Sequence, residues 1–265
     1  MRDALAQSKN VPTVRLANEV GMRRVLGVAE EFGLGRMPSH PSVVLGTAEV
    51  TPLSLTAAYA AFATLGQRPE PRFVTRVTDR RGQVVWQQAP RAHRVMDPAA
   101  AFVVTSMMQD VVDRGTGTGV RGAGFSAPAA GKTGTTQDAA DVWFVGFTPE
   151  YVGTIWVGLD RRQRILRGAT GGQIVAPVWG RIMRQVASGS PGWSPPSGVE
   201  RMTVDTRGVL ADSGCPLEGG TRTEYFVRGT APARNCYPAG DYYAYNDTFG
   251  YAEYQPDDEL GWWDR

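Results

Sequence analysis

Two short motifs hold the residues best suited to covalent chemistry in this 265-residue chain, Lys132-Thr133-Gly134 and Ser8-Lys9-Asn10. The first follows an Ala/Gly/Pro-rich turn and lies in a predicted β-strand. Because glycine leaves one side of a strand open, an acyl-peptide can lie beside it as an added strand. Lys132 would supply a compact positive charge, and Thr133 and Thr135 would turn hydroxyl groups toward a substrate carboxylate. The backbone N–H of Thr135 would form half of an oxyanion hole.

In the second motif, the Ser8 hydroxyl would relay protons. The Asn10 amide would orient a catalytic lysine and bond the substrate backbone. Both motifs also have simpler interpretations. A Lys-Thr-Gly triplet arises by chance in about one chain in twenty, and Ser-x-Asn about once in a chain this long. Lys132 would then only protect an edge strand from aggregation, and Ser8-Lys9-Asn10 would be a turn before Pro12.

Composition restricts the alternatives. The chain is 42% hydrophobic and 20% charged, with a net charge of +2 and scattered arginines, which does not indicate nucleic-acid binding. Only Lys9 and Lys132 among the 28 Lys+Arg are lysines, so chemistry that needs a lysine has two places to occur. There is no membrane-spanning apolar run, signal peptide, zinc-ligand spacing or G-x-S-x-G motif. We therefore expect a soluble globular protein without a metal site.

The first half of the sequence is predicted to be mainly helical. Thr13 is expected to cap a helix with Leu16 and Val20 on one face, and a second helix runs from Met22 to Phe32. Capping residues followed by proline predict two further helices, which begin at Thr51-Pro52 and at Asp97-Pro98.

Residues 72–87 change to a period of two and predict a β-hairpin around Asp79-Arg80-Arg81-Gly82. Three short strands are then predicted at 132–136, 142–147 and 151–159, and a last helix over 176–186. The composition of residues 189–198 is that of a linker. The segment beyond it is either a small loop-rich subdomain or partly disordered.

The span from Arg2 to about Val186 resembles the transpeptidase domain of class A penicillin-binding proteins, the bifunctional peptidoglycan synthases. Further segments beyond it, such as EYFVRGTAP, resemble the C-terminal extensions of that family. The resemblance implies an α/β (α+β) serine acyltransferase fold of the penicillin-binding-protein/β-lactamase type, with helices on both faces of an antiparallel sheet. It rests on several stretches in the family's order: ALAQSKNVPTVRLANEVG, LGTAEVTPLSLTAAYAAFATLG, MMQDVVDRGTGTG, GKTGTTQDAADVWFVGFTPEYVGTIWVG and TGGQIVAPVW.

The resemblance assigns Ser8 and Asn10 to the family's second motif, and Lys132, Thr133 and Gly134 to its third, with Thr135 as a substrate-carboxylate contact. In such enzymes a serine attacks the penultimate D-Ala carbonyl of a peptidoglycan stem peptide and expels the terminal D-Ala. The amine of a second stem then resolves the acyl-enzyme. β-Lactams acylate the same serine, and the family uses no cofactor.

The family's nucleophile lies in a Ser-x-x-Lys motif, which this sequence lacks. The residues three positions before Lys9 and Lys132 are Ala6 and Ala129. Because that motif precedes Ser-x-Asn in the family, we expect it upstream of Met1, together with a glycosyltransferase domain and a membrane anchor. Residues 1–189 are then a transpeptidase domain truncated at its N-terminus, and 190–265 a linker and C-terminal extension. The full-length parent would act at the extracytoplasmic (periplasmic) face of the cytoplasmic membrane.

Two features of the C-terminal region stay open at this stage. Cys215 and Cys236 enclose a short loop, and an extracytoplasmic setting would allow a disulfide between them; two buried thiols are the alternative. The aromatic tail from Tyr242 to Trp263 could stack on sugars, dock on a partner protein or pack on the main domain.

The motifs leave two alternatives to transpeptidation. A D,D-carboxypeptidase differs only in using water as the acceptor. A non-catalytic module would bind stem peptides or synthesis partners without acyl transfer.

The missing Ser-x-x-Lys generates a first prediction. Purified chain 1–265 forms no covalent adduct with labelled penicillin, because no serine in it has a lysine three residues later to act as base. Intact-protein mass spectrometry after incubation with penicillin measures this directly. A serine found acylated in the purified chain would contradict the prediction.

Overall fold

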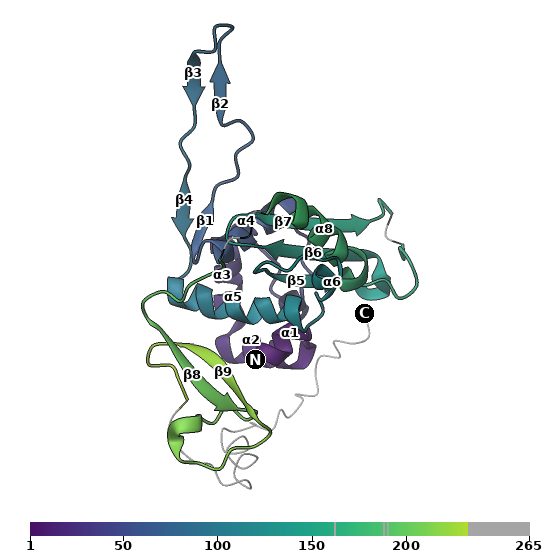
Figure 1. The fold of residues 1–265 in the computed structure, drawn as a ribbon. Coiled ribbons are helices and arrows are strands. Elements are labelled where there is room, and N and C mark those ends of the chain that lie inside the picture. The colour runs from purple at the N-terminus through teal and green to yellow at the C-terminus, as the bar shows by residue number, and fades with distance from the viewer. Residues whose placement is uncertain (162, 188, 190, 233–265) are drawn as a thin grey trace. The chain divides into compact units, whose positions relative to one another are not determined.

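A computed structural model describes residues 1–161, 163–187, 189 and 191–232. The described residues form two compact units, one of residues 1–200 with 225–228, and one of residues 201–224 with 229–232 (Figure 1). Within the described ranges, no helix is long and apolar enough to cross a membrane. The candidate site residues 8–10 and 132–135 lie in the first unit.

A three-stranded antiparallel sheet forms the centre of the first unit (Figure 1). Its strands are β5 (Ala130–Thr135), β6 (Asp141–Phe147) and β7 (Val152–Gly158), in the order β5-β6-β7. All three predicted strands are confirmed, and β5 with the Lys-Thr-Gly motif is an edge strand. The β6–β7 turn is closed by the Thr148 hydroxyl, which accepts hydrogen bonds from the backbone N–H groups of Glu150 and Tyr151.

The two faces of this sheet pack against different helices. Side chains alternate along β6, so Phe144 and Phe147 point to opposite faces. Phe144 is fully buried against Trp179 of α8 (Ala176–Val186), with ring centroids 5.6 Å apart. Phe147 packs with Ala63 of α4 (Pro52–Ala63) and Met108 of α5 (Pro98–Asp113). The fold is therefore the predicted one, an antiparallel sheet with helices on both faces.

Local sequence signals explain the two helices on the Phe147 face. The Thr51 side chain accepts a hydrogen bond from Ser54 N–H, and the Asp97 side chain from Ala99 and Ala100 N–H; Pro52 and Pro98 follow these caps. Both predicted helix starts are confirmed. The other helices are α1 (Arg2–Ala6), α2 (Asn10–Val20), α3 (Met22–Glu31), α6 (Gly119–Gly122) and α7 (Gly171–Ile174), with short 3₁₀ turns at Pro41–Leu45, Gln137–Ala139 and Ala211–Ser213.

The predicted helix cap at Thr13 is wrong. Helix α2 begins at Asn10, and the Thr13 hydroxyl donates to the Lys9 carbonyl from inside the first turn. Pro12 is compatible with this earlier start, because proline is tolerated in a first turn, where N–H groups have no intrahelical partner.

Residues 67–94 form a long hairpin, which we call the arm (Figure 1). At its base β1 (Gln67–Pro69) pairs with β4 (Ala92–Arg94), and at its tip β2 (Arg76–Thr78) pairs with β3 (Val84–Gln87). The Asp79 carboxylate accepts hydrogen bonds from the N–H groups of Arg81 and Gln83 and closes the tip. The hairpin predicted over 72–87 is confirmed, whereas the base ladder was not predicted.

Two strands follow residue 198, β8 (Val199–Asp205) and β9 (Thr221–Val227), and they pair with each other. Asp205 is fully buried and accepts backbone hydrogen bonds from Arg207, Val209 and Glu218. In the segment with linker composition, Trp193 packs on Phe147 and donates to the Ala63 carbonyl. Cys236 and the aromatic tail lie outside the described residues, so the Cys215–Cys236 disulfide stays a prediction.

The packing of Phe144 generates a second prediction. Phe144→Ala lowers the free energy of unfolding by about 3–5 kcal/mol, because it leaves a cavity beside Trp179 in the core. Urea denaturation followed by tryptophan fluorescence measures the change. The matched control is Val157→Ala on the neighbouring strand, where the side chain is 37% exposed and the expected loss is less than about 1 kcal/mol. Equal losses in both variants would contradict the assignment of the core.

Candidate active site

The two motifs found in the sequence meet in the folded chain. The Lys132 Nζ donates a hydrogen bond of 2.7 Å to the Ser8 Oγ, across a sequence separation of 124 residues. It donates a second bond of 2.9 Å to the Thr133 carbonyl. A hydroxyl held by an ammonium group is a geometry suited to passing protons.

Burial changes the pKa of Lys132, the lysine of this pair. It lowers the pKa of Lys132 to about 8, because the charged form loses solvation. Within the described residues, no ion pair opposes this effect. Near pH 8 the amine is therefore present in comparable amounts of its charged and neutral forms, so it can either hold an anion or exchange a proton.

A tight turn presents Ser8 to the lysine. Helix α1 ends at Ala6, and the Lys9 N–H donates back to the Ala4 carbonyl. Ser8 has φ +54°, a left-handed conformation that is uncommon for residues other than glycine and is typical of functional turns. Asn10 begins α2 directly afterwards and is exposed. Ser8 and Asn10 thus stand on either side of the exposed Lys9 on the surface of one loop.

The edge of β5 offers backbone groups to a ligand. The Thr136 N–H donates to the Asp141 carbonyl of β6, and amide directions alternate along a strand. The N–H groups of Thr133 and Thr135 therefore point toward the open edge, away from β6. This is the direction that an added peptide strand, or an oxyanion next to Thr135, requires.

The threonine hydroxyls of β5 have protein partners. Alternation puts Thr133 and Thr135 on the α8 face of the sheet and Lys132 on the other face. The Thr133 Oγ1 lies 2.6 Å from the Thr116 Oγ1, and the Thr135 Oγ1 accepts a 3.1 Å bond from the Gly171 N–H. Each hydroxyl keeps capacity for a further hydrogen bond, so these contacts orient the groups without saturating them.

Thr116 is a site residue that sequence reasoning missed. Its N–H donates 3.0 Å to the Ala6 carbonyl, two residues before Ser8, and its hydroxyl bonds Thr133 on β5. A side chain on Gly115 would lie 2.2 Å from the Ala6 carbonyl oxygen, so only glycine permits this approach. The Gly-Thr-Gly-Thr-Gly run at 115–119 is the signal in the sequence that marks this close approach.

Gly134 lies in a row across the sheet with Trp143 and Trp156. A Cβ on Gly134 would stand 3.2 Å from the Trp143 Cβ, a tight contact. The two indole rings are 5.8 Å apart, and the Trp156 N–H donates to Asp141. Gly134 therefore leaves the strand without a side chain next to Lys132, and its role toward a substrate stays a prediction.

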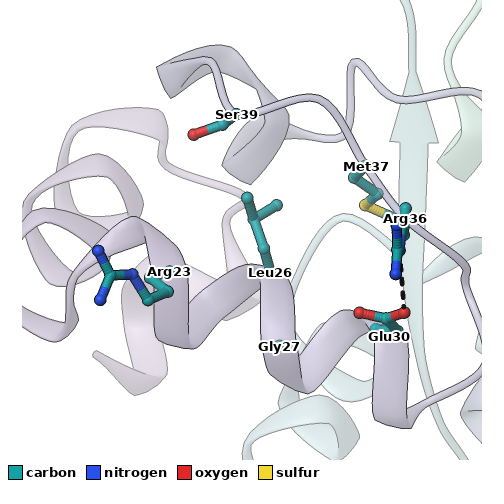
Figure 2. A pocket seen from close by; sticks show the side chains of 7 residues that line it. All are labelled: Arg23, Leu26, Gly27, Glu30, Arg36, Met37 and Ser39. Carbon is teal, nitrogen blue, oxygen red and sulfur yellow. Dashed lines mark ion pairs between the residues drawn. The ribbon is translucent and has the colours of Figure 1, made fainter.

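A separate hollow of about 580 Å³ lies along α3 and the loop that follows it (Figure 2). Its lining includes the exposed pair Arg36–Glu30, 3.6 Å apart, together with Arg23 and Ser39. No lysine or histidine lines it. Among the described residues, no group of three or more His, Cys, Asp or Glu side chains is arranged to hold a metal ion.

The antiparallel sheet and the paired Ser-x-Asn and Lys-Thr-Gly motifs are typical of serine acyltransferase domains, and comparisons with known proteins identify the family. Residues 1–184 match the family described as the penicillin binding protein transpeptidase domain, and residues 195–238 match the penicillin-binding protein 1A C-terminal domain. This chain therefore belongs to the penicillin-binding protein transpeptidase family, of the 1A type.

Individual relatives support this assignment. Penicillin-binding protein 1A of Aquifex aeolicus is 37% identical over 239 residues, which cover 89% of this chain and 32% of that protein. Penicillin-binding protein 2D of Bacillus subtilis is 34% identical, covering 99% and 38%. The chain thus spans about a third of the length of these curated relatives.

Solved structures show the same fold. The crystal structure of penicillin-binding protein 1A from Haemophilus influenzae matches with a TM-score of 0.81 at 26% identity, covering 89% of this chain and 41% of that one. PonA1 from Mycobacterium tuberculosis, in complex with penicillin V, matches with a TM-score of 0.64 at 25% identity, covering 74% and 58%.

The environment of Lys132 generates a third prediction. Chain labelled with ¹³C-lysine gives two side-chain signals, since Lys9 and Lys132 are the two lysines, and the Lys132→Arg variant assigns them. The Lys132 signal titrates with a midpoint near pH 8, because burial disfavours its charged form. A midpoint for Lys132 at the ordinary lysine value of about 10.4 would contradict the described burial.

Proposed function

We propose that this chain supplies the Ser-x-Asn and Lys-Thr-Gly sides of a D-Ala-D-Ala transpeptidase site that cross-links peptidoglycan stem peptides. The observation that carries the proposal is the 2.7 Å bond between Lys132 Nζ and Ser8 Oγ. This bond joins two motifs that would each be a weak signal alone.

Each residue has a role that its geometry supports. A stem peptide would lie along the open edge of β5, with its terminal carboxylate near Lys132, Thr133 and Thr135. The Thr135 N–H would stabilise the oxyanion that forms at the penultimate D-Ala carbonyl. Ser8, coupled to Lys132, would pass a proton to the departing D-Ala amine, and Asn10 would bond the substrate backbone. Gly134 leaves room for the peptide.

The acyl step also needs a serine nucleophile with its own lysine base, and no Ser-x-x-Lys occurs in residues 1–265. The serine would attack the D-Ala carbonyl and release the terminal D-Ala, and an amine from a second stem would then attack the ester. With water as the acceptor the same steps give a D,D-carboxypeptidase. We propose that this nucleophilic serine comes from a segment that is not in this sequence.

The proposal also covers ligands and location. β-Lactams mimic the D-Ala-D-Ala terminus, and the related PonA1 structure contains penicillin V. Peptidoglycan cross-linking takes place outside the cytoplasmic membrane, so the full-length parent would work at its extracytoplasmic face, held by an N-terminal anchor.

The absence of a Ser-x-x-Lys motif favours one other function, a non-catalytic module that binds stem peptides or partner proteins. The two functions differ in whether ligand binding depends on Lys132. Substrate in the proposed site needs this charge, whereas docking elsewhere on the chain does not.

A fourth prediction tests the site. The chain binds a peptide ending in D-Ala-D-Ala, and Lys132→Ala weakens this binding about 10- to 100-fold, since a hydrogen bond to a charged group contributes about 1.5–3 kcal/mol. Isothermal titration calorimetry measures both affinities.

Two controls make the result specific. Lys9→Ala removes the other lysine, at an exposed position between Ser8 and Asn10, and leaves the affinity unchanged. The same peptide with a C-terminal amide binds weakly to the unsubstituted chain, because it lacks the carboxylate. Peptide binding that survives Lys132→Ala would reject the proposed site and favour the docking module.

A further inference from the structure

The arm, residues 67–94, carries a concentrated positive charge that the net charge of the whole chain does not reveal. It contains seven arginines and two acidic residues, Glu70 and Asp79, and so has a formal charge of +5. The remaining 237 residues carry 21 basic and 24 acidic side chains, a formal charge of −3. The net charge of +2 is therefore the sum of a basic arm and a mildly acidic remainder.

Most of this charge is available to a partner. Arg76, Arg80, Arg81 and Arg91 are exposed, and within the described residues none of them forms an ion pair. Both acidic groups of the arm are already engaged. The Glu70 carboxylate bonds His93 at 2.6 Å, and the Asp79 carboxylate closes the tip turn.

Large apolar side chains lie between these arginines. Val77 faces Trp86 across the β2–β3 ladder, and the two are 43% and 45% exposed. Phe73 is 85% exposed, and at least half of the surface of Val74, Val84 and Val85 is exposed. A two-stranded ribbon is marginally stable in water, so such a ribbon with uncovered apolar groups is typical of a surface that contacts a partner.

The spacing of the charges favours an extended partner. Arginine recurs at every fourth position along one side of the hairpin, at residues 68, 72, 76 and 80. Four residues of extended chain span about 13 Å. A row of this kind fits a polymer with repeating anionic groups, and it fits a compact acidic patch on a folded protein less well.

We infer that the arm is a docking surface for the peptidoglycan polymer itself, separate from the site that holds one stem peptide. This inference rests on the proposed function, which makes a glycan with peptide carboxylates the substrate. The guanidinium groups would bind the carboxylates of successive stems in bidentate fashion. Trp86 and Phe73 would cover the apolar faces of sugar rings, as exposed aromatic groups at binding surfaces do. The arm would thereby keep the polymer attached to the chain while individual stems enter and leave the site at β5.

A fifth prediction tests the arm in the full chain. The chain sediments with isolated peptidoglycan sacculi at about 0.05 M salt and is largely released at about 0.5 M, because arginine–carboxylate contacts at the surface are screened. Replacement of Arg76, Arg80, Arg81 and Arg91 by glutamine weakens sedimentation at least about tenfold. The matched control replaces the exposed Arg15, Arg23 and Arg24, outside the arm, by glutamine and leaves sedimentation unchanged.

The aromatic contribution distinguishes a glycan polymer from other anionic partners. Trp86→Ser with Phe73→Ser reduces binding to sacculi but does not change binding to poly-L-glutamate, which has carboxylates and no sugars. Chain that binds poly-L-glutamate or phosphatidylglycerol vesicles but not sacculi would overturn the inference and indicate an acidic protein or a membrane surface. Because all these side chains are exposed, circular dichroism melting curves should match the unsubstituted chain.

Failure of the arm and failure of the proposed function give different results. If the arm is the docking surface, Lys132→Ala no longer binds the D-Ala-D-Ala peptide but still sediments with sacculi. The four-arginine variant still binds the peptide but no longer sediments with sacculi. Equal sedimentation of the arm variant and the unsubstituted chain overturns only the inference that the arm is a docking surface. Unchanged peptide affinity in Lys132→Ala overturns the site alone.

Discussion

The contact of Thr116 with both motif-bearing segments is the constraint on which the rest of the site depends. Its N–H holds Ala6 at 3.0 Å, and its hydroxyl holds Thr133 at 2.6 Å. The Ser8 turn is exposed and short. Further bonds hold α1 against α5: Arg2 donates to Ser106, and the Gln7 side chain donates to the Arg114 carbonyl. Because Gly115 lets the backbone approach Ala6 so closely, the turn is tied to the end of α5, and α5 in turn packs on the sheet. The backbone contacts thus fix the distance between the Ser8 turn and β5, and the bond from Lys132 to Ser8 forms across this distance.

The two faces of the central sheet and its open edge have different roles. The α8 face buries Phe144 and Trp179 and gives the rigidity. The opposite face buries Phe147 under α4 and α5 but carries Lys132 near the open edge, where packing is dense enough to lower the pKa of the amine to about 8. An edge strand usually has to be protected from pairing with other chains. In the proposed site, the same unpaired N–H groups are the feature that a peptide substrate would use.

Charge is distributed in this protein by structure as much as by composition. At +2 for 265 residues, the average suggests no electrostatic role, and the arginines look scattered along the sequence. The arm brings seven of them onto one narrow ribbon with exposed aromatic groups. The low lysine content makes a related point. A bias toward arginine explains 26 of the 28 basic residues, whereas Lys132 occupies a position where a compact ammonium that can lose its proton differs chemically from a guanidinium.

The sequence alone determined the family, the three strands of the sheet, the capped starts of α4 and α5 and the extent of α8. These follow from local patterns: side-chain periodicity, proline after a capping residue, and motifs in a fixed order. It placed Ser8, Asn10 and Lys132 in one site through resemblance, but it could not show that Ser8 and Lys132 are in contact. Only the tertiary structure decided that Ser8 lies 2.7 Å from Lys132, that Thr116 joins both segments, and that Thr133 and Thr135 lie on the face opposite Lys132. The expected cap at Thr13 is wrong because the observed N-cap, Lys9, makes no side-chain capping bond and therefore leaves no capping signal in the sequence. The contacts that assemble the site join residues far apart in the chain, and the free energy of such contacts leaves no periodic trace in the sequence.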